Sequence, residues 1–260
     1  MIKKGKIILA LYIIITCIAF VLVGQIVFFT FNNAPIDQIN TVDMRLHIPV
    51  PFAVFTRSSI TPKEITHGDT SKKDVIFTFD GGGGIQSGDK ILEVLAKHHV
   101  KGTFFLTGKM VATNPDLVKR IAAAGNEIFS HTYDHPNLTM ISNDQIGSEL
   151  AKFENILQAT VGISPKPYFR APYGARNSRV LAVAAKYGYQ SVYWTVDARD
   201  WMKSPQENPA KVKERILSSV APGNIYLMHV GDTITGQILD SVFTAIEARG
   251  YKIVSLTQGL

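Results

Sequence analysis

Cysteine is almost absent from this sequence. The single cysteine among its 260 residues, Cys17, lies within an apolar segment, so the chain cannot form an internal disulfide. Lipid attachment at Cys17 would need a small residue before it and a polar chain soon after it, whereas Thr16 precedes it and the apolar run continues past Phe28. We therefore expect neither a disulfide framework nor a lipoprotein signal.

Motifs for nucleic acids and nucleotides are also lacking. The net charge of +6 favours anionic surroundings such as lipid head groups or a cell wall, although solubility explains it equally well. No basic helix, zinc finger or aromatic RNA-binding motif accompanies that charge. Gly83 and Gly88 have the first spacing of a phosphate-binding loop, but Asp89 stands where that loop needs lysine. Nucleic acid and nucleotide are therefore not expected partners.

Charged residues are missing from positions 7–36. The apolar run over residues 7–31 is long enough to span a bilayer as a helix, which takes about 20 residues. Lys3, Lys4 and Lys6 precede the run and predict a cytoplasmic N-terminus, with the remaining chain outside the cell membrane. A cleaved signal peptide, which would give a secreted form, is the alternative. Residues 1–31 are thus predicted to be a cytoplasmic tip and a single-pass signal anchor.

After the anchor, the pattern predicts a linker and then one catalytic domain. Residues 32–73 contain four prolines and polar patches, which is typical of an extracytoplasmic linker or stalk. Within residues 74–260, strands are predicted over residues 75–79, 103–106, 127–129, 168–169, 191–196, 225–228 and 252–254. Helices are predicted over residues 90–98, 115–124, 144–160, 178–187, 209–220 and 236–249. Seven strands that alternate with helices predict a barrel-like α/β fold with parallel strands.

Polar residues follow most of these strands. Asp80 follows the first predicted strand, and His131 and His135 follow the third. Arg170 follows the fourth strand, Asp200 and Trp201 follow the fifth, and His229 follows the sixth. Chemistry in such folds lies where the strands end, so these side chains should meet at one rim.

The residue types at that rim suit metal-assisted amide hydrolysis. His131 and His135, if one helical turn apart, can both face one metal ion, and a metal-bound water is a nucleophile near neutral pH. Asp80 can take the proton of that water, and a protonated His229 can donate a proton to a leaving amine. Asp200 can orient and charge-stabilise His229. The four glycines after Asp80 would let the backbone pass close to a ligand or metal.

Five short motifs resemble those of the polysaccharide deacetylases, the family of the NodB-like chitooligosaccharide deacetylase domain (carbohydrate esterase family 4). They are Thr78-Phe79-Asp80, Ser130-His131-Thr132-Tyr133-Asp134-His135-Pro136, Phe169-Arg170-Ala171-Pro172-Tyr173-Gly174, Asp197-Ala198-Arg199-Asp200-Trp201 and Leu227-Met228-His229. All five occur in the family's order, and together they are far more specific than any one of them.

The resemblance implies a distorted (β/α)7 barrel and a divalent metal, usually zinc, with cobalt, manganese or nickel as alternatives. By resemblance, Asp80 is the general base, Arg170 orients Asp80, and His131 and His135 bind the metal. His229 is the general acid, and Asp200 tunes it. The Tyr173 N–H, next to Pro172, holds the oxyanion, and Trp201 and Leu227 form the walls of the pocket for the acetyl group. The substrate would be a cell-wall or surface glycan such as peptidoglycan or a chitin-like polymer of N-acetylglucosamine or N-acetylmuramic acid.

One position departs from the family pattern. The family usually has a second aspartate directly after the base, as the third metal ligand, and this chain has Gly81 there. Water, Asp134 or Asp232 could fill the place, Asp80 could bind the metal itself, or the site could be inactive. The main prediction is therefore an N-deacetylase, with two alternatives: a non-catalytic glycan-binding protein that kept the fold, and another metal-dependent C–N hydrolase.

Overall fold

The computed structural model describes residues 63–204 and 206–260, all within one compact unit, Arg57–Leu260. None of the helices in this described part is both long enough and apolar enough to cross a membrane. The anchor predicted over residues 1–31, Cys17 and most of the linker predicted over residues 32–73 lie outside the described residues. The anchor therefore stays a prediction.

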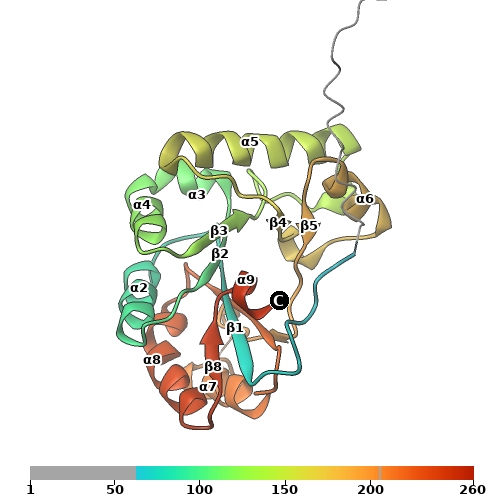
Figure 1. The fold of residues 1–260 in the computed structure, drawn as a ribbon. Helices are drawn as coiled ribbons and strands as arrows, with labels where there is room; N and C mark the ends of the chain where they lie inside the picture. Colours follow the sequence, from blue (N-terminus) through green and yellow to red (C-terminus); the bar gives the residue numbers. More distant parts are fainter. Residues whose placement is uncertain (1–62, 205) are drawn as a thin grey trace, which may run out of the picture. The chain divides into compact units, whose positions relative to one another are not determined.

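Eight parallel strands form one curled sheet with β1 near its centre (Figure 1). They are β1 (Asp74–Gly81), β2 (Thr103–Leu106), β3 (Glu127–Ser130), β4 (Tyr168–Phe169), β5 (Gln190–Ser191), β6 (Val196–Asp197), β7 (Ile225–His229) and β8 (Lys252–Val254). The order is β5-β4-β3-β2-β1-β7-β6, and β8 pairs with β1 outside that path.

The central strand β1 is buried on both faces, as a strand with helices on one side and a filled interior on the other must be. Successive side chains point to opposite faces, so Phe77 and Phe79 join the main core beneath the helices. Ile76 joins a smaller interior cluster that includes Phe105 of β2. Thr78 and Asp80 share the interior face with Ile76, which places Asp80 at the end of β1 on the inner side of the sheet.

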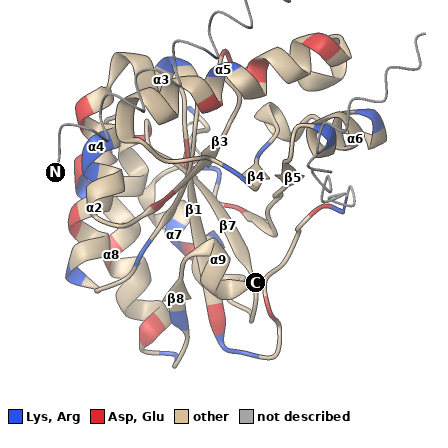
Figure 2. Cartoon of the chain, turned by 45° about the horizontal axis from the view of Figure 1, so that its top comes forward, with Lys and Arg blue, Asp and Glu red and all other residues tan. Residues whose placement is uncertain are grey.

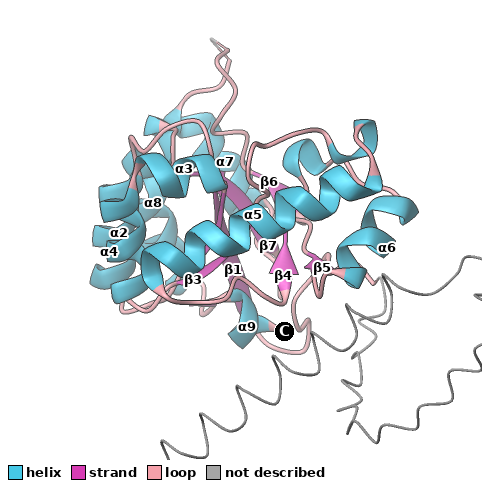
Figure 3. Cartoon of the chain, turned by 90° about the horizontal axis from the view of Figure 1, so that it is seen from above, coloured by secondary structure: helices cyan, strands magenta, loops and turns pink. Residues whose placement is uncertain are grey.

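Most of the helices lie around the outside of the sheet, as Figure 3 shows from above. They are α2 (Gly88–Lys97), α3 (Gly108–Thr113), α4 (Pro115–Ala123), α5 (Asn143–Val161), α6 (Ser178–Lys186), α7 (Pro209–Ser218), α8 (Thr233–Glu247) and α9 (Leu256–Gly259), with short 3-10 turns at Leu138–Met140 and Pro172–Gly174. Charged residues of both signs lie mainly on the outer helices (Figure 2), so the outer surface has no single dominant sign.

The predicted parallel α/β fold is confirmed, but the prediction of a barrel of seven strands is not confirmed in that form. The run over residues 191–196 does not form one strand: it gives the end of β5 and the start of β6, at opposite edges of the sheet. Between them, Tyr193 N–H donates to the Ile65 carbonyl at 2.7 Å, and Thr195 N–H donates to the Ile225 carbonyl at 2.9 Å. No strand ladder joins β5 to β6 among the described residues, so the sheet is a curled half-barrel.

Residues 63–73, predicted as the end of the linker, are attached to the catalytic unit. Ile65 forms a parallel bridge with Val192. Gly68 N–H donates to the Gly223 carbonyl at 2.8 Å, and Asp69 N–H donates to the Gly259 carbonyl at 2.7 Å. The compact unit therefore begins before residue 74.

The C-terminal helix α9 is fixed by a single carboxylate. Glu127, the first residue of β3, accepts the backbone N–H groups of Leu256 at 3.0 Å and of Thr257 at 3.1 Å. It also accepts the Ser255 hydroxyl at 2.8 Å. Leu256 is buried in the interior cluster, so α9 fills the inside of the sheet near the amino ends of the strands. The carboxyl ends stay free for the polar residues.

Candidate active site

The strand register brings the predicted acid and base side by side. Asp80 ends β1 on its inner face, and its partner in the β1–β7 ladder is His229, the last residue of β7. His131 directly follows β3, and Arg170 directly follows β4. All four lie at the carboxyl ends of parallel strands, the edge at which α/β folds place their sites.

Asp80 is buried and bound by a buried arginine. Arg170, which is fully buried, donates from Nη1 to Asp80 Oδ1 at 2.6 Å and to Thr78 Oγ1 at 2.8 Å. Its Nε and Nη2 donate to the carbonyls of Val192 and Tyr193. Burial by itself would raise the pKa of Asp80, but the charge of Arg170, with smaller effects of the nearby histidines, holds that pKa below its usual range. Asp80 is therefore an ionised base, which Arg170 orients.

The two predicted metal-binding histidines face each other. His131 Nδ1–H donates to the Arg170 carbonyl at 2.9 Å, which leaves the lone pair of a neutral ring on Nε2. That Nε2 lies 3.1 Å from His135 Nε2 and 3.5 Å from Asp80 Oδ2. Burial lowers the pKa of His131, and burial followed by the proximity of His131 lowers the pKa of His135 to about 4. Both rings are thus neutral near pH 7, the form that binds metals.

A turn, and not a helix, sets the spacing of these histidines. The sequence interpretation assumed one helical turn, but residues 131–135 form an irregular loop in which Thr132 has φ 67° and His135 has φ 62°. Such left-handed conformations are strained for non-glycine residues and persist where the surroundings fix them. Four of the five described non-glycine residues with positive φ lie in the site loops: Thr132, His135, Tyr173 and Arg199.

His229 is paired with a buried carboxylate. Its Nδ1–H donates to Asp200 Oδ1 at 2.8 Å, and its backbone N–H donates to Asp200 Oδ2 at 2.8 Å. Thr235 of α8 also donates its hydroxyl to Asp200 Oδ2. Burial by itself would lower the pKa of His229, but the hydrogen bond and charge of Asp200, with the charges of Asp80 and Asp232, raise it. The raised pKa favours the protonated form that a general acid needs.

The histidine pair fits a metal ion, but a third protein ligand is missing. Two neutral imidazole Nε2 atoms converge, which suits zinc and similar divalent ions. No group of three His, Cys, Asp or Glu side chains that could hold a metal occurs within residues 63–204 and 206–260. Asp80 approaches His131, yet it is bound to Arg170. A site here would therefore have two imidazole ligands and solvent or substrate in its other positions.

An aspartate at position 81, which the family resemblance would predict, requires two neighbouring side chains to move. A Cβ at Gly81 would lie 2.5 Å from the Met110 sulfur and 2.7 Å from Leu106 Cδ2, and both side chains are buried. The other carboxylates considered as replacements lie elsewhere. Asp134 is paired with Lys109 at 2.9 Å. Asp232 precedes α8 and interacts with Asp200 and His229. Neither joins the histidine pair in a group that could hold a metal.

The predicted pocket residues surround these groups to different degrees. The Tyr173 ring is exposed and packs edge-on against His135, with ring centres 4.5 Å apart. Trp201, also exposed, lies edge-on to His229 with ring centres 6.5 Å apart. Pro172 and Leu227 are buried. Tyr173 and Trp201 thus lie beside the metal-site and acid histidines, while Leu227 neighbours Thr78 in the β1–β7 ladder.

The glycine-rich loop after β1 serves a close approach between loops. A Cβ at Gly231 would lie 3.0 Å from Gly84 N, so the two loops pass each other at backbone distance. Ser87 N–H then donates to the Val230 carbonyl at 2.9 Å. Gly82 is the glycine nearest the site, since its Cβ would lie 4.0 Å from His135 Cδ2. The close passage seen here is to the loop after β7. Passage close to a ligand or metal stays a prediction.

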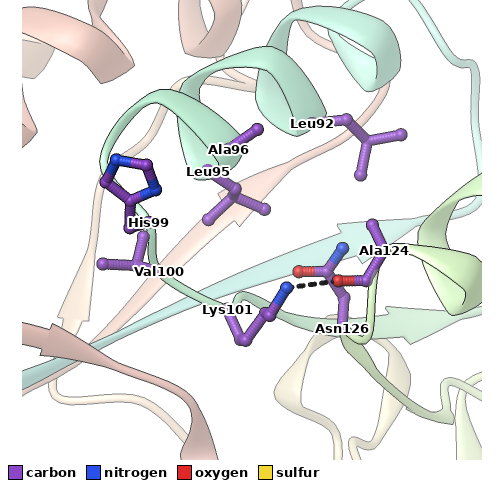
Figure 4. Close-up of a pocket in the computed structure, with 8 residues that line it drawn as sticks. All are labelled: Leu92, Leu95, Ala96, His99, Val100, Lys101, Ala124 and Asn126. Carbon is purple, nitrogen blue, oxygen red and sulfur yellow. Dashed lines mark hydrogen bonds between the residues drawn. The ribbon is translucent and has the colours of Figure 1, made fainter.

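A separate pocket lies at the opposite ends of the strands (Figure 4). It has a volume of about 340 Å³ and is lined by Leu92, Leu95, Ala96, His99, Val100, Lys101, Ala124 and Asn126. Lys101 and Asn126 precede β2 and β3, whereas the predicted catalytic residues follow strands. Lys101 Nζ donates to the Ala124 carbonyl at 2.5 Å, so the one cation of the lining already has a partner. This pocket is not the reaction site.

The sequence did not predict two features that position the loop between His131 and His135. Glu149 of α5 accepts the N–H groups of Tyr133 and Asp134, which lie between the histidines. Helix α3 was not predicted, and its Gly108 N–H donates to the Thr132 carbonyl at 3.0 Å. A lone glutamate within an amphipathic helix gives no sequence signal for such a role. In the sequence, Gly108 looks like a turn residue. The signal for α3 is Thr107, whose side chain accepts the Met110 N–H and caps the helix.

Comparisons with known proteins agree with this geometry. A family model described as polysaccharide deacetylase matches residues 67–192. The peptidoglycan-N-acetylmuramic acid deacetylase PdaA of Bacillus subtilis is 34% identical over 189 residues, covering 73% of this chain and 72% of that protein. The peptidoglycan-N-acetylglucosamine deacetylase of Bacillus cereus is 34% identical over 193 residues, covering 73% of this chain and 69% of that protein.

The fold also resembles the solved structure of a pseudoenzyme. BA3943 from Bacillus anthracis, a family 4 carbohydrate esterase pseudoenzyme, has a TM-score of 0.72 and 32% identity, covering 77% of this chain and 69% of that chain. A BA3943 mutant with restored enzymatic activity has the same TM-score and 34% identity, covering 77% and 72%. Fold, motif order and sequence identity agree, and the chain belongs to the polysaccharide deacetylases of carbohydrate esterase family 4.

Proposed function

We propose that this deacetylase hydrolyses N-acetyl groups on peptidoglycan or a related cell-wall glycan, with a divalent metal ion, zinc in the first place, held by His131 and His135. One observation carries the proposal. Asp80, whose pKa is lowered, and His229, whose pKa is raised, are register partners on adjacent strands, and the histidine pair lies beside Asp80. Such a pair of oppositely tuned groups defines the base and the acid of a hydrolysis.

Each residue of the site has its own part in the hydrolysis. When bound, the ion supplies Lewis-acid activation of water and of the amide carbonyl. Asp80 takes a proton from the attacking water, whose oxygen bonds to the acetyl carbon. The Tyr173 N–H holds the oxyanion that forms, as the family resemblance implies. His229 donates its proton to the sugar nitrogen as the C–N bond breaks, and the products are acetate and a free amine.

We further propose that the enzyme acts outside the cell membrane, anchored by residues 7–31. The charge-free run after three lysines supports an anchor whose catalytic domain faces outward. A cell-wall substrate supports the same location, since both named relatives are peptidoglycan deacetylases. Cleavage of the segment would give a secreted form of the same enzyme.

Acetate release by the full-length protein tests the proposed activity. Substrates are peptidoglycan and N-acetylglucosamine oligomers, each with a chelator or with added zinc, cobalt, manganese or nickel. We expect release that the chelator abolishes and an added ion restores, because the histidine pair holds the ion that activates water. Release that is insensitive to the chelator would refute the metal, and no release from any substrate would refute the activity.

A second function, glycan binding without catalysis, is favoured by one observation. Gly81 stands where the family has a metal-binding aspartate, and a structural neighbour of this chain is a pseudoenzyme. Binding of peptidoglycan fragments by a folded protein that releases no acetate and binds no zinc would support this function. The intact Asp80–Arg170 and His229–Asp200 pairs favour catalysis over it.

The pH dependence tests the role of Asp200. The reaction needs protonated His229, so activity falls as the pH rises through the pKa of His229, which Asp200 raises. In Asp200→Asn the carboxylate charge is lost and this pKa falls. The alkaline limb of the kcat/KM profile is therefore expected to move to lower pH. Asp197→Asn is the matched control, because Asp197 bonds to the Arg199 N–H and not to His229. An unmoved limb in Asp200→Asn would refute His229 as the acid.

A further inference from the structure

We infer that Glu149 is a positioning residue for the histidine pair: its carboxylate fixes the backbone between His131 and His135 and so sets the distance between their Nε2 atoms. The inference rests on the proposed metal site. Glu149 lies on α5, outside the family motifs in sequence, and no hydrogen bond joins it to either histidine ring.

The contacts of Glu149 are directed at the loop alone. Its side chain is buried, and one oxygen, Oε2, accepts the Tyr133 N–H at 2.9 Å and the Asp134 N–H at 2.7 Å. Among the described residues no arginine, lysine or histidine lies within ion-pair distance of Glu149; Lys109 pairs with Asp134, and its charge reaches Glu149 only from farther away. A buried carboxylate without a directly paired cation is costly unless hydrogen bonds hold it. The loop amides are its partners, so the carboxylate and the loop depend on each other.

The other side of the same loop is fixed by α3. Gly108 N–H donates to the Thr132 carbonyl at 3.0 Å, and Lys109 N–H donates to the Tyr133 carbonyl at 3.1 Å. A Cβ at Gly108 would lie 2.1 Å from the Tyr133 ring, so only glycine lets α3 come this close. The loop is therefore held between the amino end of α3, which binds its carbonyls, and Glu149, which binds its amides.

This clamp explains how a strained loop persists. Thr132 and His135 flank the two clamped residues and both have left-handed backbones. Without Glu149, the Tyr133 and Asp134 amides lose their acceptor, and the loop can relax toward ordinary backbone angles. The 3.1 Å approach of the imidazoles depends on that backbone. A displacement of even about 0.5 Å matters for a site that binds through only two protein ligands.

The test compares two glutamates that accept paired backbone amides. Glu149→Ala removes the clamp, and Glu149→Gln can keep it, because both amides bond to one oxygen that a glutamine carbonyl replaces. Glu127→Ala is the matched control, since Glu127 accepts two amides of α9 away from the site. Zinc affinity by calorimetry and thermal unfolding are measured on each metal-free full-length variant, with kcat and KM for acetate release.

We expect Glu149→Ala to weaken zinc binding by about 10- to 100-fold, the usual effect of removing a group that orients a ligand. Glu149→Gln should restore most of that affinity, and Glu127→Ala should lower the unfolding temperature while zinc affinity stays within about twofold. Unchanged affinity in Glu149→Ala would overturn the inference. So would an equal loss in Glu127→Ala, because the effect would then follow stability.

Hydrogen exchange separates this inference from the proposed function. If the wild-type protein binds no zinc, the metal site fails, and exchange of the peptide that spans residues 131–135 in metal-free protein decides the inference. Faster exchange in Glu149→Ala than in wild type and Glu127→Ala supports the clamp. Equal exchange in all three proteins overturns it.

Discussion

Replacing Asp80 with asparagine is expected to lower kcat/KM for acetate release by about 10²- to 10⁴-fold, the usual contribution of a positioned general base. The amide has nearly the shape of the carboxylate and can still accept the hydrogen bond from Arg170, but it cannot take a proton from water. Binding of glycan should be unchanged, because Asp80 is buried and serves the reaction step.

Acetate release and glycan affinity are measured together on the same preparation of Asp80→Asn. Metal affinity is recorded as well, since Asp80 Oδ2 lies 3.5 Å from His131 Nε2. Activity within about tenfold of wild type would refute Asp80 as the base. A loss of zinc equal to the loss of activity would show that Asp80 acts as a ligand and not as the base.

Replacing Arg170 with methionine is expected to lower the free energy of unfolding by about 3–5 kcal/mol, the usual cost of removing one partner from a buried ion pair. The change leaves Asp80 without its cation in a buried site and removes the hydrogen bond to Thr78. Without the opposing charge of Arg170, burial raises the pKa of Asp80. The acid limb of the kcat/KM profile should therefore move to higher pH.

Denaturant unfolding of Arg170→Met, Asp80→Asn and the double variant checks this prediction. The double variant should regain part of the stability, because no unpaired charge remains in the core. Arg176→Met is the matched control, since Arg176 pairs with Glu64 near the surface and should cost clearly less. A similar loss in both arginine variants would show that the packing of the long side chain, and not the buried charge, explains the effect.

Much of the sheet could be predicted from the sequence because its strands are short apolar runs between helical patterns. The strands over residues 103–106, 168–169 and 252–254 have the predicted bounds. The prediction of one strand over residues 191–196 was wrong, because the Tyr193 N–H donates to the carbonyl of Ile65. Ile65 is far away in the sequence, so local patterns do not reveal this contact. The same contact explains why the linker was predicted to extend too far.

The residues of the site could also be predicted only in part. The motif residues could be found because polar side chains directly after buried strands stand out. The contacts between them depend on register, which placed Asp80 opposite His229. Glu149 and Met110 could not be found from the sequence, because their roles arise from packing between α5, α3 and the site loops. Their residue types are ordinary for the helices in which they occur.

The methionine beside Gly81 determines what an engineered third ligand would require. An aspartate at position 81 would place its Cβ 2.5 Å from the Met110 sulfur and 2.7 Å from Leu106 Cδ2, both of which belong to flexible side chains. Both side chains are buried, so they must move before the carboxylate fits. Redesign of the site toward three ligands therefore starts with a shorter residue at position 110 and not with aspartate alone.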